Sequence, residues 1–101
     1  MLGIYMNLDE ISAAQVAELF STLSDTSRVR IIAALSGTEL NVTELTERVG
    51  LSQSAVSHHL RHLRQMRLVR NRKSGRHVYY LLDDAHIEDL FRCALEHVQH
   101  G

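Results

Sequence analysis

Two pairs of potential metal ligands lie at the two ends of the last helix that the sequence predicts. Asp84-x-His86 comes at its beginning and His97-x-x-His100 at its end. His86 and His97 are 11 residues apart, which is roughly 16 Å along a helix that rises ~1.5 Å per residue. A first-row transition metal holds its ligands at ~2.0–2.2 Å, so any two ligand atoms lie within about 4 Å of each other. The spacing therefore predicts that one metal ion takes one pair from each of two chains.

Two copies of this helix, packed antiparallel across a two-fold axis, would bring the pairs together twice. The result would be a homodimer with two metal sites between its subunits. Each site would offer three imidazoles and one carboxylate, a tetrahedral donor set that suits Zn²⁺ or Co²⁺. The competing interpretation is that histidines near a helix end are solvated or cap its carbonyl groups. The metal site is favoured because Asp84 and His86 lie at the other end of the same helix, where an antiparallel partner would bring its His97 and His100.

The other residues of this helix are arranged for contact with a partner. At ~100° per residue, one side of the helix is a wide apolar stripe. The stripe consists of Ile87, Leu90, Phe91, Ala94, Leu95 and Val98. The three histidines lie together along one flank of it, where ligands shared between two subunits are expected. Cys93 lies on the same flank near the expected two-fold axis, and we expect it to be a buried apolar side chain rather than a ligand.

Basic residues are concentrated in one block of the chain. Residues 51–82 contain seven arginine and lysine residues and no acidic residue, although the chain as a whole has a net charge of −1. A solvated basic face is the ordinary explanation for such a block. The elements predicted within it favour instead a surface for a polyanion such as DNA.

Four helices are predicted before and within this block, from apolar periodicity and capping residues. They cover residues 9–22, 28–35, 43–49 and 52–66. Asn41-Val42-Thr43 opens the third helix, with Thr43 as its cap, and Ser52 caps the fourth. A short helix, a tight turn containing glycine and a longer helix form the helix-turn-helix pattern.

A β-hairpin and a final helix follow. The strands are predicted over residues 68–72 and 76–82, joined by a turn at Lys73-Ser74-Gly75, and the last helix covers 85–99. The order of elements is therefore four helices, two strands and one helix. We predict a mainly α fold with a β-hairpin wing, that is, a winged helix-turn-helix, which forms a homodimer through its terminal helices.

The DNA-binding surface is assigned to the outward face of the fourth helix and to the wing. Val56, Leu60 and Leu63 have helical spacing and are expected to face the core. The candidate contacts on the helix are Gln53, Ser54, Ser57, His58, Arg61 and Arg64, and those on the wing are Arg70, Arg72, Lys73 and Arg76. Two such surfaces related by a two-fold axis imply a palindromic operator with half-sites about one turn apart.

Three stretches of the chain resemble the ArsR/SmtB family of bacterial repressors. They are LSDTSRVRII over residues 23–32, LSQSAVSHHL over 51–60 and GRHVYYL over 75–81. The resemblance covers about residues 10–100. It implies a dimeric winged-helix protein that represses an operon for metal or metalloid resistance, and whose affinity for DNA falls when the inducer binds.

The resemblance also narrows the kind of inducer site. Family sites that are built on cysteines do not fit, because residues 39–45 (ELNVTEL) contain none and the chain has a single cysteine. The family site between the C-terminal helices requires an Asp-x-His and a His-x-x-His, which match Asp84, His86, His97 and His100. The match implies the zinc/cobalt-sensing (CzrA-like) branch of the family.

Two further expectations follow from the resemblance. Nickel-sensing relatives add ligands to the same four positions, and no histidine precedes His58 and nothing follows Gly101 in this sequence, so Ni²⁺ is the less expected ion. In relatives the residue matching His97 bonds to a backbone carbonyl after the recognition helix, here near Arg67. That bond would couple metal binding to the release of DNA.

Composition bounds the remaining classes of function. The 101 residues predict a single winged-helix domain over 1–101, with dimerisation helices at both ends. No apolar run approaches 18 residues and no signal peptide is visible, which together with a single cysteine predicts a cytoplasmic protein without a membrane span. No enzyme is expected, because no metal site with an open position and a nearby general base is apparent. The alternatives are a nickel/cobalt sensor that uses the same site and a metal-independent winged-helix DNA-binding protein.

Overall fold

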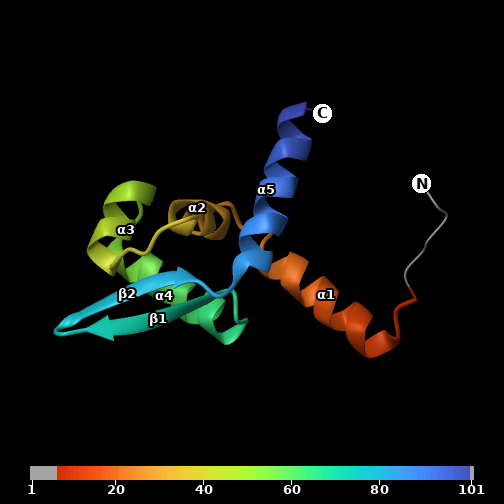
Figure 1. The fold of residues 1–101 in the computed structure, drawn as a ribbon, viewed down its shortest axis with the longest axis horizontal. Coiled ribbons are helices and arrows are strands. Elements are labelled where there is room, and N and C mark those ends of the chain that lie inside the picture. The colour runs from red at the N-terminus through yellow and green to blue at the C-terminus, as the bar shows by residue number, and fades with distance from the viewer. Residues whose placement is uncertain (1–6, 101) are drawn as a thin grey trace.

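The computed structural model describes residues 7–100, which form five helices and one two-stranded antiparallel sheet (Figure 1). The elements in chain order are α1 (Glu10–Thr22), α2 (Thr26–Leu35), α3 (Val42–Val49), α4 (Gln53–Gln65), β1 (Val69–Ser74), β2 (His77–Leu82) and α5 (Ala85–His100). This is the predicted winged helix-turn-helix, with α3 and α4 as the helix-turn-helix and the hairpin as the wing. In that part of the chain, no helix is long and apolar enough to cross a membrane.

Each of the first four helices begins at a side chain that accepts a hydrogen bond from the backbone of the first turn. The capping residues are Asp9, Asp25, Asn41 and Ser52. Helix α3 has a complete capping box, in which Asn41 and Glu44 each bond to the other's backbone N–H. The predicted cap at Thr43 was therefore wrong, because Asn41 already supplies the oxygen. Helix α2 likewise begins at Thr26, two residues earlier than predicted, because Asp25 caps it.

The hydrophobic core lies between α2, α3, α4 and the base of the hairpin. Val56, Leu60 and Leu63 of α4 are buried as predicted. They pack in one cluster with Ile31, Ile32, Leu35, Leu40, Leu45, Val49, Leu68, Val69 and Leu82. Because the inward face of α4 is anchored in this way, its opposite face is held toward solvent on a rigid support.

The wing is longer and its turn is tighter than predicted. Lys73 pairs with Val78 and Ser74 with His77, so both residues belong to β1 rather than to the turn. Only Gly75 and Arg76 connect the strands, and Gly75 has a φ of 62°, a region that glycine enters without steric cost. The predicted turn at residues 73–75 was wrong by about two positions for this reason.

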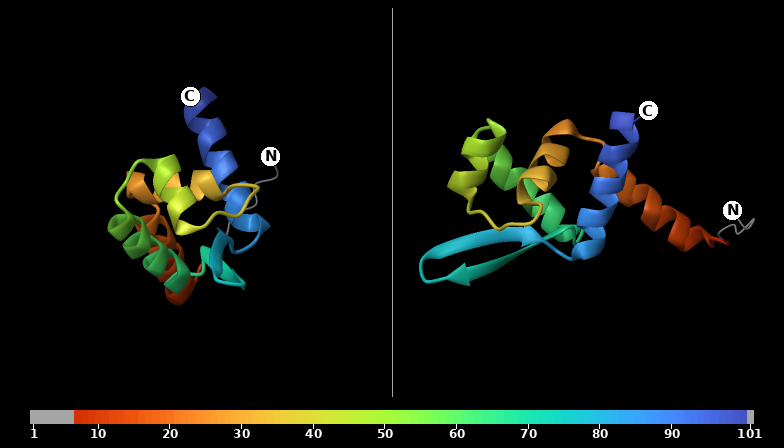
Figure 2. Two further views of the ribbon diagram at one scale, coloured as in Figure 1. Left: turned by 90° about the vertical axis from the view of Figure 1, so that its left-hand side faces the viewer. Right: turned by 45° about the horizontal axis from the view of Figure 1, so that its top comes forward.

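Helices α1 and α5 lie outside the core. Figure 1 shows α1 extending away from the core on the side opposite the wing, and α5 rising between α2 and α1. The views in Figure 2 show the same arrangement. The molecule is accordingly elongated, with extents of 51 × 32 × 21 Å. No residue of α5 is fully buried, and α1 buries only Thr22. Large apolar side chains are left exposed on and beside these helices, namely Leu8, Ile11, Val16, Phe20, Leu95 and Val98.

Candidate metal centre and nucleic-acid interface

Asp84 and His86 lie together at the beginning of α5. Asp84 Oδ1 accepts hydrogen bonds from the backbone N–H groups of His86, at 2.8 Å, and Ile87, at 3.3 Å. These bonds cap the helix, and they leave Oδ2 of the same carboxylate for a ligand. The Nδ1 atom of His86 lies 3.4 Å from Asp84 Oδ1, and the His86 side chain is 92% exposed. The pair is thus both ordered by the helix start and open to solvent.

His97 and His100 lie in the last turn of α5 and are exposed. Within residues 7–100 no three His, Cys, Asp or Glu side chains of one chain come together as a possible metal site. The structure of one chain therefore brings the two pairs to opposite ends of a 16-residue helix and does not join them. Cys93 is also exposed in the single chain, so its predicted burial depends on a second copy.

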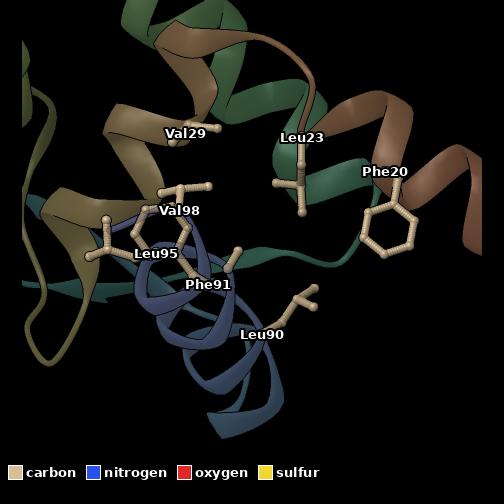
Figure 3. Close-up of a pocket in the computed structure, with 8 residues that line it drawn as sticks. Phe20, Leu23, Val29, Leu90, Phe91, Leu95 and Val98 are labelled. Carbon is tan, nitrogen blue, oxygen red and sulfur yellow. The ribbon is translucent and has the colours of Figure 1, made fainter. Parts of the chain in front are cut away.

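An apolar groove runs between α5 and the corner where α1 meets α2 (Figure 3). Its volume is about 330 Å³. Phe20, Leu23 and Val29 line one side, and α5 lines the other with Leu90, Phe91, Ala94, Leu95 and Val98. The part of the predicted stripe toward the end of α5 is uncovered in one chain, with Val98 72% exposed, whereas Ile87 and Phe91 at its beginning pack against the core. Helix α5 thus forms one wall of the groove and has the two ligand pairs at its ends.

The outward face of α4 is uncovered along its whole length. All six residues predicted for DNA contact are exposed: Gln53, Ser54, Ser57, His58, Arg61 and Arg64. The helix begins at Ser52, whose hydroxyl accepts from the backbone N–H of Ala55 at 3.1 Å. Polar and basic side chains on a well-anchored, exposed helix are the features required for insertion into a major groove.

A polar junction behind α4 was not predicted from the sequence. Arg28 Nε donates to His59 Nδ1 at 3.2 Å, and Arg28 also reaches the carbonyl oxygen of Thr22 at 3.3 Å. Asp25 Oδ2 lies 3.7 Å from both Arg28 Nε and His59 Nδ1. Burial lowers the pKa of His59, and the nearby Asp25 carboxylate opposes that effect only in part. The only sequence signal was the similarity of the stretches that contain these residues to the family pattern.

On the wing, Arg70, Lys73 and Arg76 are exposed, as a phosphate-contacting role requires. Arg72 is exposed too, but its guanidinium is engaged. Arg72 Nε donates to Glu39 Oε2 at 2.8 Å, a second contact joins its Nη2 to Glu39 Oε1, and the guanidinium carbon lies 5.2 Å from the centre of the Tyr79 ring. The structure thus separates Arg72 from the other predicted DNA-contacting residues of the wing.

Arg67 occupies an unusual backbone conformation at the end of α4. Its φ is 59°, in the left-handed region that is uncommon for residues other than glycine. Arg67 N–H donates to the Arg64 carbonyl and Leu68 N–H to the Leu63 carbonyl, the two bonds of a Schellman motif. The Leu68 carbonyl in turn accepts from Asp83 N–H at 3.0 Å. The turn that ends α4 is therefore joined by one hydrogen bond to Asp83, the residue that precedes Asp84.

The anchored helix-turn-helix, the basic wing and the exposed terminal helices together define a winged-helix DNA-binding regulator. Residues 25–71 match the family described as "Bacterial regulatory protein, arsR family". The chain is 49% identical over 94 residues to the transcriptional repressor SmtB homolog of Synechocystis, covering 93% of this chain and 70% of that protein. It belongs to the ArsR/SmtB family of bacterial transcriptional regulators, which are not enzymes.

Two further relatives agree with this assignment. The HTH-type transcriptional regulator NmtR of Mycobacterium tuberculosis is 43% identical over 93 residues, covering 92% of this chain and 78% of that one. The solution structure of apo-NmtR superposes with a TM-score of 0.80 at 40% identity, covering 100% of this chain and 85% of that one. The cadmium resistance regulatory protein CadC homolog of Staphylococcus aureus is 41% identical, covering 81% of this chain and 69% of that protein. The family therefore includes regulators of metal resistance.

Proposed function

We propose that this protein is a metal-responsive transcriptional repressor. It binds a palindromic operator as a metal-free homodimer in the cytoplasm and is released when Zn²⁺ or Co²⁺ binds at two sites between its subunits. The observation that carries the proposal is the position of the two ligand pairs, which α5 holds at its opposite ends and in solvent. A helix of that length cannot use both pairs for one ion, but two antiparallel copies can.

The uncovered apolar surface supports the homodimer. The groove between α1, α2 and α5 and the exposed side chains of Phe20, Leu95 and Val98 form one continuous region on the terminal helices. Burying this region would remove apolar surface from water, at roughly 25 cal/mol per Å². A second copy that contributes its own α5 would cover the region and, in the same step, place its histidines beside the first copy's Asp84.

The proposed donor set fits the residues present. Asp84 and His86 from one copy and His97 and His100 from the other supply one carboxylate and three imidazoles, the donors that Zn²⁺ and Co²⁺ accept in tetrahedral sites. Asp84 Oδ1 is occupied by the helix cap, so Oδ2 is the oxygen assigned to the metal. The bound ion would serve as a cross-link between subunits, while the chain's own residues set where that cross-link lies.

For DNA we assign the outward face of α4 to the major groove and the wing to the phosphate backbone or the minor groove. The assigned residues are Gln53, Ser54, Ser57, His58, Arg61 and Arg64 on α4, and Arg70, Lys73 and Arg76 on the wing. Serine and arginine contact both phosphates and base edges, so these residues account for affinity as well as for sequence readout.

Coupling between the two surfaces is assigned to the junction at Arg67. The Leu68–Asp83 hydrogen bond places the end of α4 beside the beginning of α5. A second copy's His97 that is bound beside Asp84 would therefore lie close to the backbone carbonyls at the end of the recognition helix. A liganding histidine normally donates its second ring N–H to such an acceptor, and we assign the carbonyl of Arg67 to that role. Metal and DNA then oppose each other reciprocally.

The test is a titration of Zn²⁺ and Co²⁺ into protein bound to a fluorescent duplex of its own promoter. We expect anisotropy to fall as metal is added, with cobalt absorption bands typical of a tetrahedral site. His97→Asn should bind DNA normally but not release it, whereas Glu96→Gln, an exposed neighbour on α5, should behave as the wild type. Release by Ni²⁺ alone, with a six-coordinate spectrum, would favour a nickel sensor. Unchanged anisotropy with every ion would contradict metal sensing.

A further inference from the structure

We propose that Arg72 is a positioning residue of the wing and not a phosphate contact. Its ion pair with Glu39, made across the ring of Tyr79, holds the wing against the segment between α2 and α3. The phosphate contacts of the wing are then left to Arg70, Lys73 and Arg76. This assignment rests on the proposed binding of DNA by the wing and specifies which of its cations take part.

The strand register places the side chains of Arg72 and Tyr79 on one face of the wing. Arg72 of β1 is directly opposite Tyr79 of β2, so their side chains share a face. The Arg72 guanidinium lies 5.2 Å from the centre of the Tyr79 ring, a distance at which a cation is attracted to the ring. Lys73 is the next residue along β1 and therefore points to the opposite face. Arg72 and Lys73 are thus presented to different surroundings, whereas Arg70 lies on the same face as Arg72 and differs from it in having no acidic partner among the residues that the structure describes.

Glu39 is held in place by backbone hydrogen bonds at the other edge of β2. Leu40, the next residue, exchanges two bonds with Tyr80: Leu40 N–H donates to the Tyr80 carbonyl at 3.0 Å, and Tyr80 N–H donates to the Leu40 carbonyl at 2.8 Å. The side chain of Leu40 is buried in the core. The carboxylate of Glu39 is therefore attached to the rigid body, and Arg72 connects the outer strand of the wing to that body.

Charge separates Arg72 from the other basic residues of the wing. Two hydrogen bonds to one carboxylate are the strongest arrangement that a guanidinium forms with an acid. They lower the pKa of Glu39 and raise that of Arg72, so the pair remains fully ionised at neutral pH. Within residues 7–100, Arg70, Lys73 and Arg76 form no ion pair. A paired Arg72 adds no net positive charge to the wing, whereas each of the other three does.

The test compares the salt dependence of operator binding in variants that keep or change the net charge. Each phosphate contact that is lost reduces the slope of log K against log salt concentration by about 0.9. Lys73→Gln should show that reduction. The double variant Glu39→Gln/Arg72→Gln, which preserves net charge, should weaken binding roughly tenfold at every salt concentration with an unchanged slope. A slope reduced by about 0.9 in the double variant would overturn the proposal.

Charge reversal provides the second arm. In Glu39→Arg/Arg72→Glu the ion pair is restored with its members exchanged, so we expect affinity to return to within about threefold of the wild type. If Arg72 contacted a phosphate, a glutamate in its place would repel DNA and affinity would stay low, which would overturn the proposal.

A third measurement uses the free protein and needs no DNA. The amide protons of Leu40 and Tyr80 should exchange with solvent about tenfold faster in Glu39→Gln/Arg72→Gln, and at the wild-type rate in the charge-reversed variant. Wild-type exchange rates in both variants would contradict a positioning role. Because this arm is independent of the operator, failure of the wild type to bind DNA would refute the proposed function separately.

Discussion

Arg28 at the beginning of α2 donates a hydrogen bond from Nε to Nδ1 of His59 in the middle of α4, at 3.2 Å. The same guanidinium bonds to the carbonyl of Thr22, the last residue of α1. One side chain thus joins the helix that carries part of the exposed apolar surface to the helix assigned to DNA. The bond requires a neutral His59 with its proton on Nε2, because only an unprotonated Nδ1 accepts.

The first prediction concerns the pH dependence of stability. Burial lowers the pKa of His59 below its ordinary value, with Arg28, His58 and His62 adding to the shift and Asp25 opposing it. The unfolded chain therefore binds the proton more readily than the folded one, and the free energy of unfolding falls as pH drops below about 6.5.

We expect the urea midpoint to decrease between pH 7.5 and 5.5 and to decrease less in His59→Asn. The asparagine side chain retains an acceptor near the Nδ1 position but does not titrate. His77→Asn, an exposed histidine of β2 that is not among the groups acting on the pKa of His59, is the matched control and should keep the wild-type pH dependence. Equal pH profiles for His59→Asn and the wild type would show that His59 is not the responsible group.

The second prediction concerns the end of the recognition helix. Arg67 has a φ of 59° at the position of a Schellman motif that is usually glycine. Arg67→Gly should raise the free energy of unfolding by about 0.5–1 kcal/mol, because relief of the left-handed strain exceeds the added chain entropy. Arg67→Ala retains a β-carbon and should give no gain. Urea denaturation measures both, and destabilisation by glycine would mean that the arginine side chain makes the larger contribution.

The third prediction tests the proposed dimer surface. Val98 is 72% exposed on the apolar stripe of α5. Val98→Asp should raise the dimer dissociation constant by at least roughly 100-fold, since an unpaired carboxylate is costly to bury. Sedimentation equilibrium measures the constant. Gln99→Asp, the same charge on the next exposed residue, should leave it within about threefold, and an equal effect of both changes would point to general charge repulsion.

The fourth prediction tests whether each metal site draws on two chains. One chain carries Asp84→Asn and His86→Asn, and the other carries His97→Asn and His100→Asn. Asparagine caps helices as well as aspartate does, so α5 should remain intact in the first chain. Neither homodimer should bind metal at this site.

After the two chains are refolded together, the mixed dimer should contain one complete site and bind one Co²⁺ with a tetrahedral spectrum. A site within one chain would leave the mixed dimer without any complete set of ligands. Native mass spectrometry distinguishes the mixed dimer from the two parents and counts its metal ions. A mixed dimer that bound no metal would contradict the intersubunit arrangement.

The sequence was most informative where a structural feature depends on residues close together in the chain. Asp25, Ser52 and Asp84 cap helices through bonds to backbone groups within three residues, so the helix starts could be predicted to within about two residues. The burial of Val56, Leu60 and Leu63 followed from their helical spacing. Errors of one or two residues occurred where two neighbouring side chains compete for one role, as Asn41 and Thr43 do at the start of α3.

By itself, then, the sequence determined the order of elements, the exposed face of the recognition helix and the separation of the two ligand pairs, because each is a matter of periodicity or rise along a helix. Only the tertiary structure decided which polar side chains are already engaged. Arg28 and His59 are 31 residues apart, and Glu39 and Arg72 are 33 apart. Such contacts arise from how α2, α4 and the wing pack together. They cannot be predicted from local spacing, because the residues that meet are far apart in the sequence.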